Sequence, residues 1–192
     1  MPDRNAAALD FLLTRRSRPA QTLTTPVPDR ETLREILTAA ARSPDHGKLE
    51  PWRFLVLNDA ALDRLAEACP AAAARLEIPQ DKADKQRDRF AAADLAVVVV
   101  ESPVASDKVP MVEQTYAVGG VCLALTNAAL AAGFGANWLS GWASHDPSFV
   151  QEHLGLSASE RVAGIIHIGT ETSAPPDRPR PDLDAITTWV EA

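Results

Sequence analysis

The chain contains 192 residues, of which 46% are hydrophobic and 23% are charged. These values are ordinary for a globular protein and exclude a fibrous or wholly disordered chain. With 19 Lys and Arg against 26 Asp and Glu, the formal net charge is −7, so we expect no nucleic-acid partner. At roughly 150 residues per domain, the length predicts one domain spanning residues 1–192.

Cysteine and histidine usage argues against a disulfide scaffold or a metal centre. Cys69 and Cys122 are far apart in sequence and form no Cys-x-x-Cys pair, which is typical of inert thiols in a reducing compartment. The histidines show no metal-ligand spacing, so no metal is expected. The apolar stretch 6–13 is short and interrupted by Asp10, unlike a signal peptide. We therefore expect a cytoplasmic protein.

Hydrophobic periodicity predicts an α+β fold with one layered core. In chain order we expect helices at residues 6–16, from Asp29 to Ser43, and at 60–69, 81–90, 116–132 and 147–154. The expected strands lie at residues 52–57, 95–101, 136–139 and 162–169. Asp29 is predicted to cap the second helix, whose buried face is formed by Leu33, Ile36, Leu37 and Ala40. Mixed charges in residues 81–89 indicate a solvated helix face.

Two segments are predicted to lie at the centre of the protein. Residues 95–101 contain four consecutive valines, the pattern of a strand buried on both faces. Residues 114–144 carry no formal charge, but Thr126 and Asn127 interrupt the apolar run, and a membrane span needs about 20 apolar residues. We therefore expect no membrane segment. A helix apolar on all sides is typical of the centre of a protein or of a dimer.

The C-terminal residues 171–192 differ in composition from the rest of the chain. Their four prolines, at positions 175, 176, 179 and 181, predict an extended proline-rich arm. Trp189 near its end needs a surface to pack against. An arm of this kind often lies on another subunit.

Three polar segments are candidates for ligand binding. Arg15-Arg16-Ser17-Arg18 offers three guanidiniums and a hydroxyl, which suit an anion such as a phosphate, although such a run is often only a solvated surface. Residues 41–52 include Arg42 and His46, and a histidine can bind a planar ring or transfer a proton, although an ordinary loop histidine does neither. In residues 133–142, glycines allow close backbone approach to a ligand between two tryptophans.

Several common catalytic motifs are missing from the sequence. It contains no GxGxxG, GxxxxGK[ST] or GxSxG motif. A dinucleotide-fingerprint dehydrogenase, a Walker ATPase and an α/β-hydrolase therefore lack their usual support.

In their order and spacing, the three segments resemble the nitroreductase family of FMN flavoproteins, most closely its short YdjA-type subgroup. The matching motifs are RRS at 15–17, R-x-P-D-H-x-x-x-x-P-W at 42–52, G-F-G-x-x-W-x-S-G at 133–141 and V-x-G-x-x-x-x-G-T at 162–170. The resemblance covers about residues 9–170. It implies a nitroreductase-like α+β fold with a central mixed sheet flanked by helices, in an intertwined homodimer with FMN at the interface.

The resemblance also assigns site residues. FMN is expected to contact Arg15, Arg16, Ser17, Arg42, His46, Trp138, Leu139 and Ser140. A nicotinamide nucleotide is expected to contact Ala128, Ala129, Leu130, Ala131, Ala132 and Gly133. No catalytic acid or base is assigned, because the flavin itself carries the redox chemistry.

The implied function is an FMN-dependent oxidoreductase. NAD(P)H passes a hydride to flavin N5 and leaves, and an electron-poor acceptor such as a nitroaromatic or a quinone takes its place. Two alternatives remain open: a non-catalytic FMN carrier or sensor dimer, and a related flavin chemistry such as reductive dehalogenation or flavin fragmentation. The carrier alternative rests on two departures from the subgroup, Leu139 where arginine is common and Glu50 where glutamine is usual.

Overall fold

The valine-rich segment forms the central strand of the sheet in the computed structural model, which describes residues 3–191. This strand, β3 (Leu95–Glu101), is buried along its whole length, as its sequence predicted. It pairs with β2 (Trp52–Asn58) on one side and with β5 (Arg161–Glu171) on the other. Both β4 (Gly135–Leu139) and the short β1 (Leu23–Thr24) pair with β5.

Every strand pair within the described residues is antiparallel, which differs from the mixed sheet expected from the sequence. The helical connections explain this difference. Two packed helices, α3 (Asp59–Arg75) and α4 (Gln80–Ala91), link β2 to β3 and return the chain to the end of the sheet where β2 finished. The single long helix α5 (Met111–Ala131) connects β3 to β4. β4 therefore runs in the same direction as β3, but the two strands do not pair because β5 lies between them.

Alternate side chains of β3 enter two separate cores. On one face the core includes Ala96, Val98, Val100, Leu62, Phe90 and Phe149. On the other face it includes Leu95, Val97, Val99, Ile36, Val121 and Leu125. Because side chains alternate along a strand, one apolar run serves both cores.

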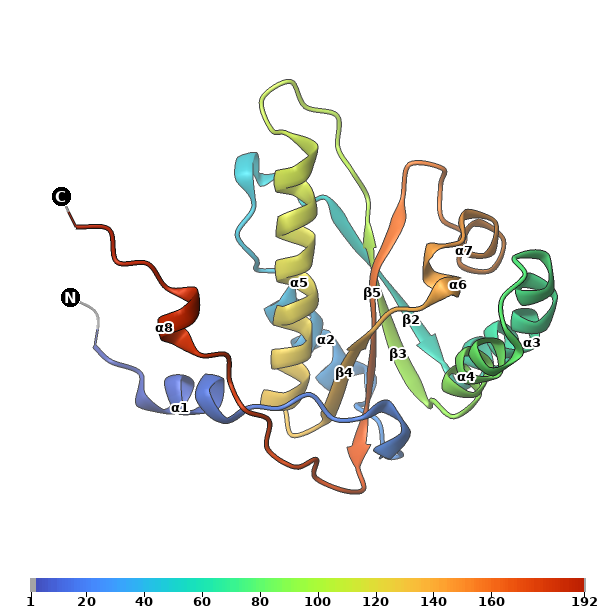
Figure 1. Ribbon diagram of the computed structural model, residues 1–192, viewed down its shortest axis with the longest axis horizontal. Helices are drawn as coiled ribbons and strands as arrows, with labels where there is room; N and C mark the ends of the chain where they lie inside the picture. Colours follow the sequence, from blue (N-terminus) through green and yellow to red (C-terminus); the bar gives the residue numbers. More distant parts are fainter. Residues whose placement is uncertain (1–2, 192) are drawn as a thin grey trace.

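The helices lie in two layers, one on each side of the sheet (Figure 1). α5 and α2 (Arg30–Ala40) cover one face, and α3, α4, α6 (Trp142–His145) and α7 (Pro147–Leu154) lie on the other side. α1 (Ala6–Thr14) and α8 (Leu183–Ile186) extend away from this body beside α5.

Most predicted elements are confirmed, with shifted ends. Asp29 caps α2 by accepting a hydrogen bond from Thr32 N at 2.8 Å, and Leu33, Ile36 and Ala40 are buried. α3 continues past its expected end to Arg75, because the alanines after Pro70 favour a helix. α4 is not a fully solvated face, since Ala83, Gln86 and Phe90 are buried where the helix packs on the body.

α5 has one buried face and one exposed apolar face. Its buried residues, among them Val118, Val121 and Leu125, pack against the sheet. Its exposed side chains include Met111, Val112, Tyr116 and Leu123. No helix within residues 3–191 is both long and apolar enough to span a bilayer.

After β5 the arm passes α1, where Arg180 donates to Leu13 O, and then extends away from the body (Figure 1). Residues 174–182 have no regular secondary structure, and the single-turn helix α8 follows. The apolar side chains of the arm are exposed, and those of Trp189 and Val190, which follow α8, are 83% and 91% exposed.

Asp146 connects two helices and provides a test of the packing. It caps α7 by accepting from Phe149 N at 3.0 Å, and it forms an ion pair with Arg75 of α3. We predict that Asp146→Ala lowers the free energy of unfolding by about 2 kcal/mol in urea denaturation, because it removes both interactions. Asp182→Ala removes the same kind of cap from the exposed α8, so it should change stability by less than about 0.5 kcal/mol. Equal effects of the two variants would contradict this account.

A second prediction concerns acid stability. Arg53 binds Glu160 through Nε–Oε1 at 2.6 Å and Nη2–Oε2 at 2.8 Å, and these bonds outweigh burial and lower the pKa of Glu160 from 4.5 to about 2. The unfolded chain binds this proton more readily, so the stabilisation is complete above pH 4.5 and is lost as the pH falls toward 2. We expect Glu160→Gln to have a shallower loss of stability in this range, measured by urea denaturation at several pH values. An unchanged pH slope would contradict the assignment.

Candidate functional site

The arginine cluster Arg15–Arg18 begins where α1 ends and lies against the start of β4. Arg18 N donates to Ala136 O at 2.9 Å, and Asn137 Nδ2 donates to Arg18 O at 2.6 Å. These bonds join segments that are far apart in sequence. The first and third predicted segments are therefore adjacent in space.

Positive charge is concentrated and partly desolvated in this cluster. Burial, and then the neighbouring Arg16 and Arg18, lower the pKa of Arg15. Its guanidinium donates to Ser17 Oγ at 3.1 Å, while its Nε is buried without a hydrogen-bond partner among residues 3–191. Arg16 pairs with Asp177 at 3.5 Å and Arg18 with Glu171 at 2.5 Å, so three guanidiniums face two carboxylates. A buried donor without a partner in a cluster with one unbalanced cation is suited to an anionic ligand.

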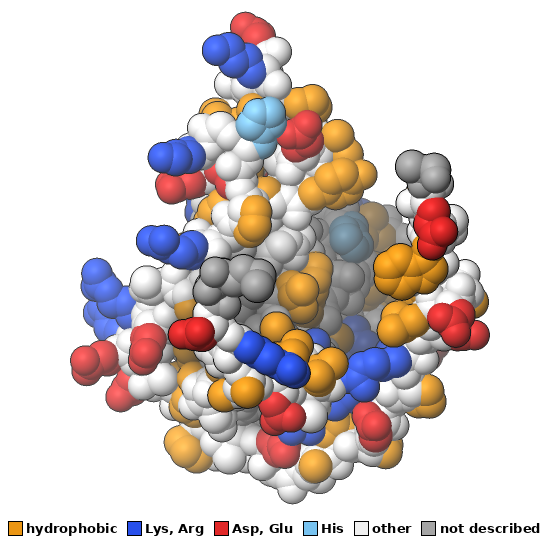
Figure 2. Space-filling model, turned by 90° about the vertical axis from the view of Figure 1, so that its left-hand side faces the viewer, with side chains coloured by type: hydrophobic (Ala, Val, Ile, Leu, Met, Phe, Trp, Pro, Cys, Tyr) orange, Lys and Arg blue, Asp and Glu red, His pale blue; other side chains and the backbone are white. Residues whose placement is uncertain are grey.

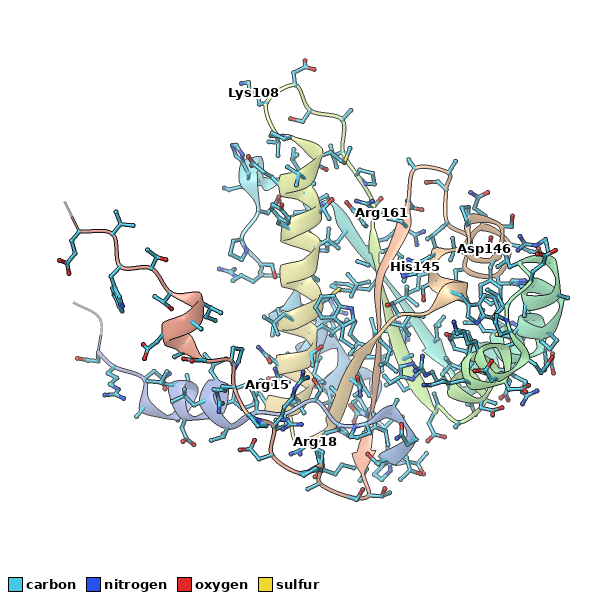
Figure 3. All side chains as sticks on the ribbon, in the orientation of Figure 1. Arg15, Arg18, Lys108, His145, Asp146 and Arg161 are labelled. Atoms are coloured by element: carbon cyan, nitrogen blue, oxygen red, sulfur yellow. The ribbon has the colours of Figure 1, made fainter. Side chains whose placement is uncertain are left out.

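Two cavities open on the cluster. One, of about 530 Å³, lies between the ends of α1, α5 and β5 and is lined by Leu130 and Gly133 together with Arg15 and Arg16. The other, of about 690 Å³, lies between the cluster and the arm, which contributes Arg178 and Arg180. Arg180 donates to Leu13 O and so connects the arm to α1. Figure 3 shows Arg15 and Arg18 near the C-terminal end of α5.

The end of β4 carries an exposed aromatic side chain, Trp138. The Trp138 indole covers β5, donating from Nε1 to Ala163 O at 3.3 Å. It lies so close to Gly164 that a Cβ there would be 2.1 Å from Nε1. Leu139 is half-buried and Ser140 is exposed at the end of the strand. Leu139 brings no cation to this site.

Sequence reasoning missed two residues of α4 beside this strand end. Gln86 is 6% exposed, and its Oε1 is so near Gly141 that a Cβ there would lie 2.0 Å away. Arg89 lies near His167, whose pKa is lowered to about 4 mainly by burial and also by this charge. The helical spacing of Ala83, Gln86 and Phe90 could have indicated that one face of α4 is buried, but the charged residues between them obscured this pattern.

The second predicted segment lies along the opposite half of α5. His46 Nδ1 is 2.6 Å from Glu113 Oε2, near the start of that helix. Arg42 is exposed. A Cβ at Gly120 would make ordinary contact with Ser43 at 3.9 Å.

The loop that carries His46 has an unusual backbone. Gly47, Lys48 and Glu50 have φ values of 74°, 53° and 49°. Asp45 Oδ2 accepts from Glu50 N at 2.7 Å and so supports this conformation. Left-handed backbone at residues other than glycine is costly and is concentrated at functional sites.

α5 separates the second segment from the arginine cluster. Glu113 and Leu130 are 17 residues apart, which corresponds to roughly 25 Å along an α-helix. No hydrogen bond or ion pair joins residues 42–48 to residues 15–18 in the described part of the chain. One copy therefore brings Arg15–Ser17 close to β4 but leaves Arg42 and His46 apart from them.

The predicted nicotinamide segment is the end of α5 and the turn that follows. Ala129 is fully buried in the core, so its side chain is not available to a ligand. Ala131, Ala132 and Gly133 are exposed, and Leu130 and Gly133 line the cavity beside Arg15. This segment therefore adjoins the arginine cluster.

Comparison with known proteins shows the family of this chain. The sequence profile described as "Nitroreductase family" matches residues 12–170. The chain belongs to the nitroreductase family. It is 34% identical over 163 residues to an Escherichia coli (strain K12) protein named "Putative NAD(P)H nitroreductase YdjA", covering 85% of this chain and 87% of that protein. The resemblance inferred from the motifs is confirmed.

Solved structures share the fold. A nitroreductase-like family protein from Bacillus cereus superposes with a TM-score of 0.78 and 24% identity over the full length of both chains. A Desulfovibrio desulfuricans protein, described as a "putative nitroreductase in complex with fmn", has a TM-score of 0.74 and 21% identity, with 98% of this chain and 99% of that one covered. The predicted nitroreductase-like α+β fold is confirmed.

The contact between Trp138 and Gly164 can be tested directly. We predict that Gly164→Ala lowers the free energy of unfolding by about 1–3 kcal/mol and changes the near-UV circular dichroism, because the new methyl group displaces the indole. Gly120→Ala is the control, since its methyl group meets only Ser43 at ordinary contact distance. A wild-type spectrum and stability for Gly164→Ala would contradict the contact.

Proposed function

We propose that this nitroreductase-family protein is an FMN-dependent oxidoreductase that takes a hydride from NAD(P)H and passes it to an electron-poor acceptor. The observation that carries the proposal is the buried, unpartnered Nε of Arg15 within a cluster of arginines beside the end of β4. A phosphate monoester would supply an acceptor for this donor and balance the positive charge that remains after Arg16 pairs with Asp177 and Arg18 with Glu171.

The fit of FMN depends on how many cations remain for its phosphate. In our proposal Arg15, Arg16 and Ser17 hold the phosphate. Arg178 and Arg180 line the same cavity and offset the missing cation at Leu139. The arm is thus part of the site as well as an extension of the chain.

The remaining predicted contacts concern the flavin ring and the nicotinamide nucleotide. Bound FMN supplies the hydride-accepting ring. In our proposal the strand end Trp138–Ser140 positions this ring, and the positive charge of the cluster favours its reduced anionic form. The half-buried Leu130 and the exposed residues 131–133 receive the nucleotide, because they adjoin the cluster and carry no charge that would repel it.

We further propose that the functional unit is a homodimer. Apolar side chains are exposed on α1, on α5 and on the arm: Leu9, Leu12, Leu13, Met111, Val112, Tyr116, Leu123, Leu183, Ile186, Trp189 and Val190. Figure 2 shows apolar side chains on both sides of the hollow between the arm and the body. Monomers rarely expose so much apolar surface, and a second copy would cover it.

A two-fold dimer would also complete the site. If two α5 helices pack antiparallel, the N-terminal half of one lies beside the C-terminal half of the other. The partner copy would then bring its Arg42 and His46 to the arginine cluster of this copy. This accounts for the separation of these residues within one chain.

Anaerobic spectroscopy tests the proposed function. We expect the purified, FMN-saturated protein to show a visible flavin band that bleaches on addition of NADH or NADPH and returns on addition of a quinone. A flavin band that persists with both nucleotides would instead support the carrier or sensor alternative. A protein that refuses added FMN would contradict the proposal.

Removing phosphate contacts tests the assignment of the cluster. Arg15→Ala combined with Ser17→Ala should weaken FMN binding by at least about tenfold, measured by fluorescence titration, because a charge-assisted and a neutral hydrogen bond are lost. Arg34→Ala on the exposed face of α2 is the control and should bind FMN like the wild type. Full flavin occupancy of the double variant after gel filtration would contradict the assignment.

A further inference from the structure

The arm brings a carboxylate to the arginine cluster. The cavity of about 690 Å³ between the cluster and the arm is lined by Ser17 and by four arginines, at positions 15, 16, 178 and 180. Asp177 is the one Asp or Glu among the described residues that line this cavity. Its negative charge repels the kind of ligand that the four arginines attract.

The Asp177 carboxylate contacts two donors at unequal distances. Its Oδ1 accepts from Arg178 N at 2.8 Å and lies 3.5 Å from Arg16 Nη1. The Asp177 side chain is 88% exposed, and an ion pair that is so open to water contributes little to stability. The closer bond, to Arg178 N, lies within the arm and does not depend on the cluster. Asp177 can therefore leave Arg16 at little cost.

The second carboxylate beside the cluster is held differently. Glu171 pairs with Arg18 at 2.5 Å, and the two side chains are 28% and 25% exposed. Glu171 also belongs to β5, where it pairs in register with Leu23, so its backbone is fixed. We therefore expect Glu171 to stay in place when an anion binds.

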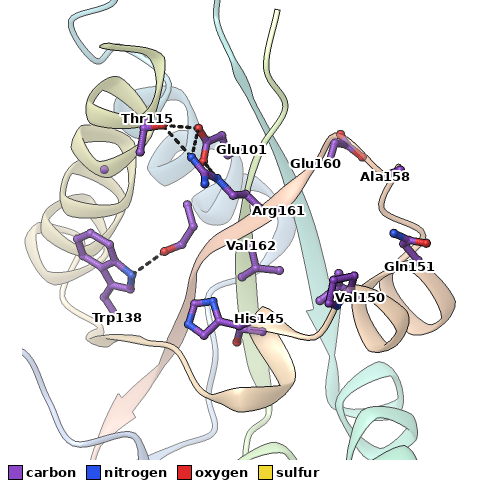
Figure 4. A pocket seen from close by; sticks show the side chains of 14 residues that line it. Glu101, Thr115, Trp138, His145, Val150, Gln151, Ala158, Glu160, Arg161 and Val162 are labelled. Atoms are coloured by element: carbon purple, nitrogen blue, oxygen red, sulfur yellow. Dashed lines mark hydrogen bonds and ion pairs between the residues drawn. The ribbon is translucent and has the colours of Figure 1, made fainter. Parts of the chain in front are cut away.

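The cavity beside Trp138 contains a third and still more protected pair. Arg161 donates to the carboxylate of Glu101, whose side chain is only 3% exposed, and to Thr115 Oγ1 at 2.9 Å (Figure 4). Separating a buried pair leaves a charge uncompensated, which is costly. Asp177 has neither this burial nor a place in the sheet.

A phosphate monoester suits the cluster better than the carboxylate of Asp177 does. It carries about two negative charges near pH 7 and has three oxygen acceptors. These acceptors can bind Arg16 and also the buried Nε of Arg15, which has no hydrogen-bond partner among residues 3–191. Two anions beside the same guanidinium repel each other, so only one of them can occupy Arg16.

We propose that Asp177 is an internal competitor for the phosphate site: its carboxylate pairs with Arg16 until a phosphate ester takes its place. Asp177 thereby lowers the affinity of the cluster for phosphate-bearing ligands and sets how tightly they are held. Binding of such a ligand also breaks the contact between Asp177 and the cluster. That the ligand is FMN rests on the proposed function, whereas competition at Arg16 does not.

FMN and riboflavin test the proposal, because they share one ring and differ in the phosphate. Asp177→Asn keeps the acceptor for Arg178 N and removes the charge. We expect it to tighten FMN binding by about threefold at low ionic strength and to leave riboflavin binding unchanged, measured by fluorescence titration of the full chain freed of flavin. Equal gains for the two flavins, or no gain for FMN, would overturn the proposal.

Two further variants separate competition at Arg16 from a general effect of charge. Asp184→Asn removes the same charge from the same arm outside the cavity, so it should bind FMN like the wild type. In an Arg16→Gln background, Asp177→Asn should bring a clearly smaller gain, because the guanidinium for which it competes is absent. A full gain in that background would show that Asp177 acts only by repulsion at a distance, and would overturn the proposal.

Pyrophosphate separates this proposal from the proposed function. Isothermal titration calorimetry with pyrophosphate on the same proteins requires neither a flavin nor turnover. Asp177→Asn should bind pyrophosphate about threefold more tightly than the wild type does, and Asp184→Asn should not. A protein that refuses FMN contradicts the proposed function, and this titration then decides the present proposal. Equal pyrophosphate affinities of the wild type and Asp177→Asn, or no binding by either, would overturn it.

Discussion

The long helix α5 is the constraint on which the rest of the structure depends. One of its faces is buried against the sheet, and the arginine cluster and the His46 loop lie beside opposite ends of the helix, whose rise from Glu113 to Leu130 is roughly 25 Å. No charged residue follows Glu113 along this helix, so its outer face is apolar or small and lacks a partner within one copy. The same helix therefore explains the burial pattern of one chain and, in the proposed dimer, would bring the two halves of the site together.

The protein uses arginine in two contrasting ways. In the cluster at residues 15–18, guanidiniums outnumber their carboxylate partners and one buried N–H lacks an acceptor, which favours a ligand that brings negative charge. In the cavity beside Trp138, Arg161 is held by the buried Glu101, so the guanidinium offers hydrogen bonds without net charge. The cluster therefore keeps an excess of positive charge, whereas the Arg161–Glu101 pair carries no net charge.

Sequence reasoning recovered the elements with strong periodicity and missed the contacts that depend on tertiary packing. The valines of β3, the Asp29 cap and the motif order all carry local signals. The Arg161–Glu101 pair joins residues 60 apart, and the burial of Gln86 depends on how α4 packs, so neither could be read from local pattern. The antiparallel pairing of β2 with β3 follows from the α3–α4 connection, whose effect on strand direction appears only in three dimensions.

The most direct test of the central claim is the flavin content of a mixed dimer. One copy would carry Arg15→Ala and Ser17→Ala, and its differently tagged partner Arg42→Ala and His46→Ala. Each variant alone should lose FMN. If the site is assembled from two copies, one site of the mixed dimer keeps both intact segments, and the purified dimer should hold one FMN. A mixed dimer without flavin would contradict the account, because it would show that both segments act within the same chain.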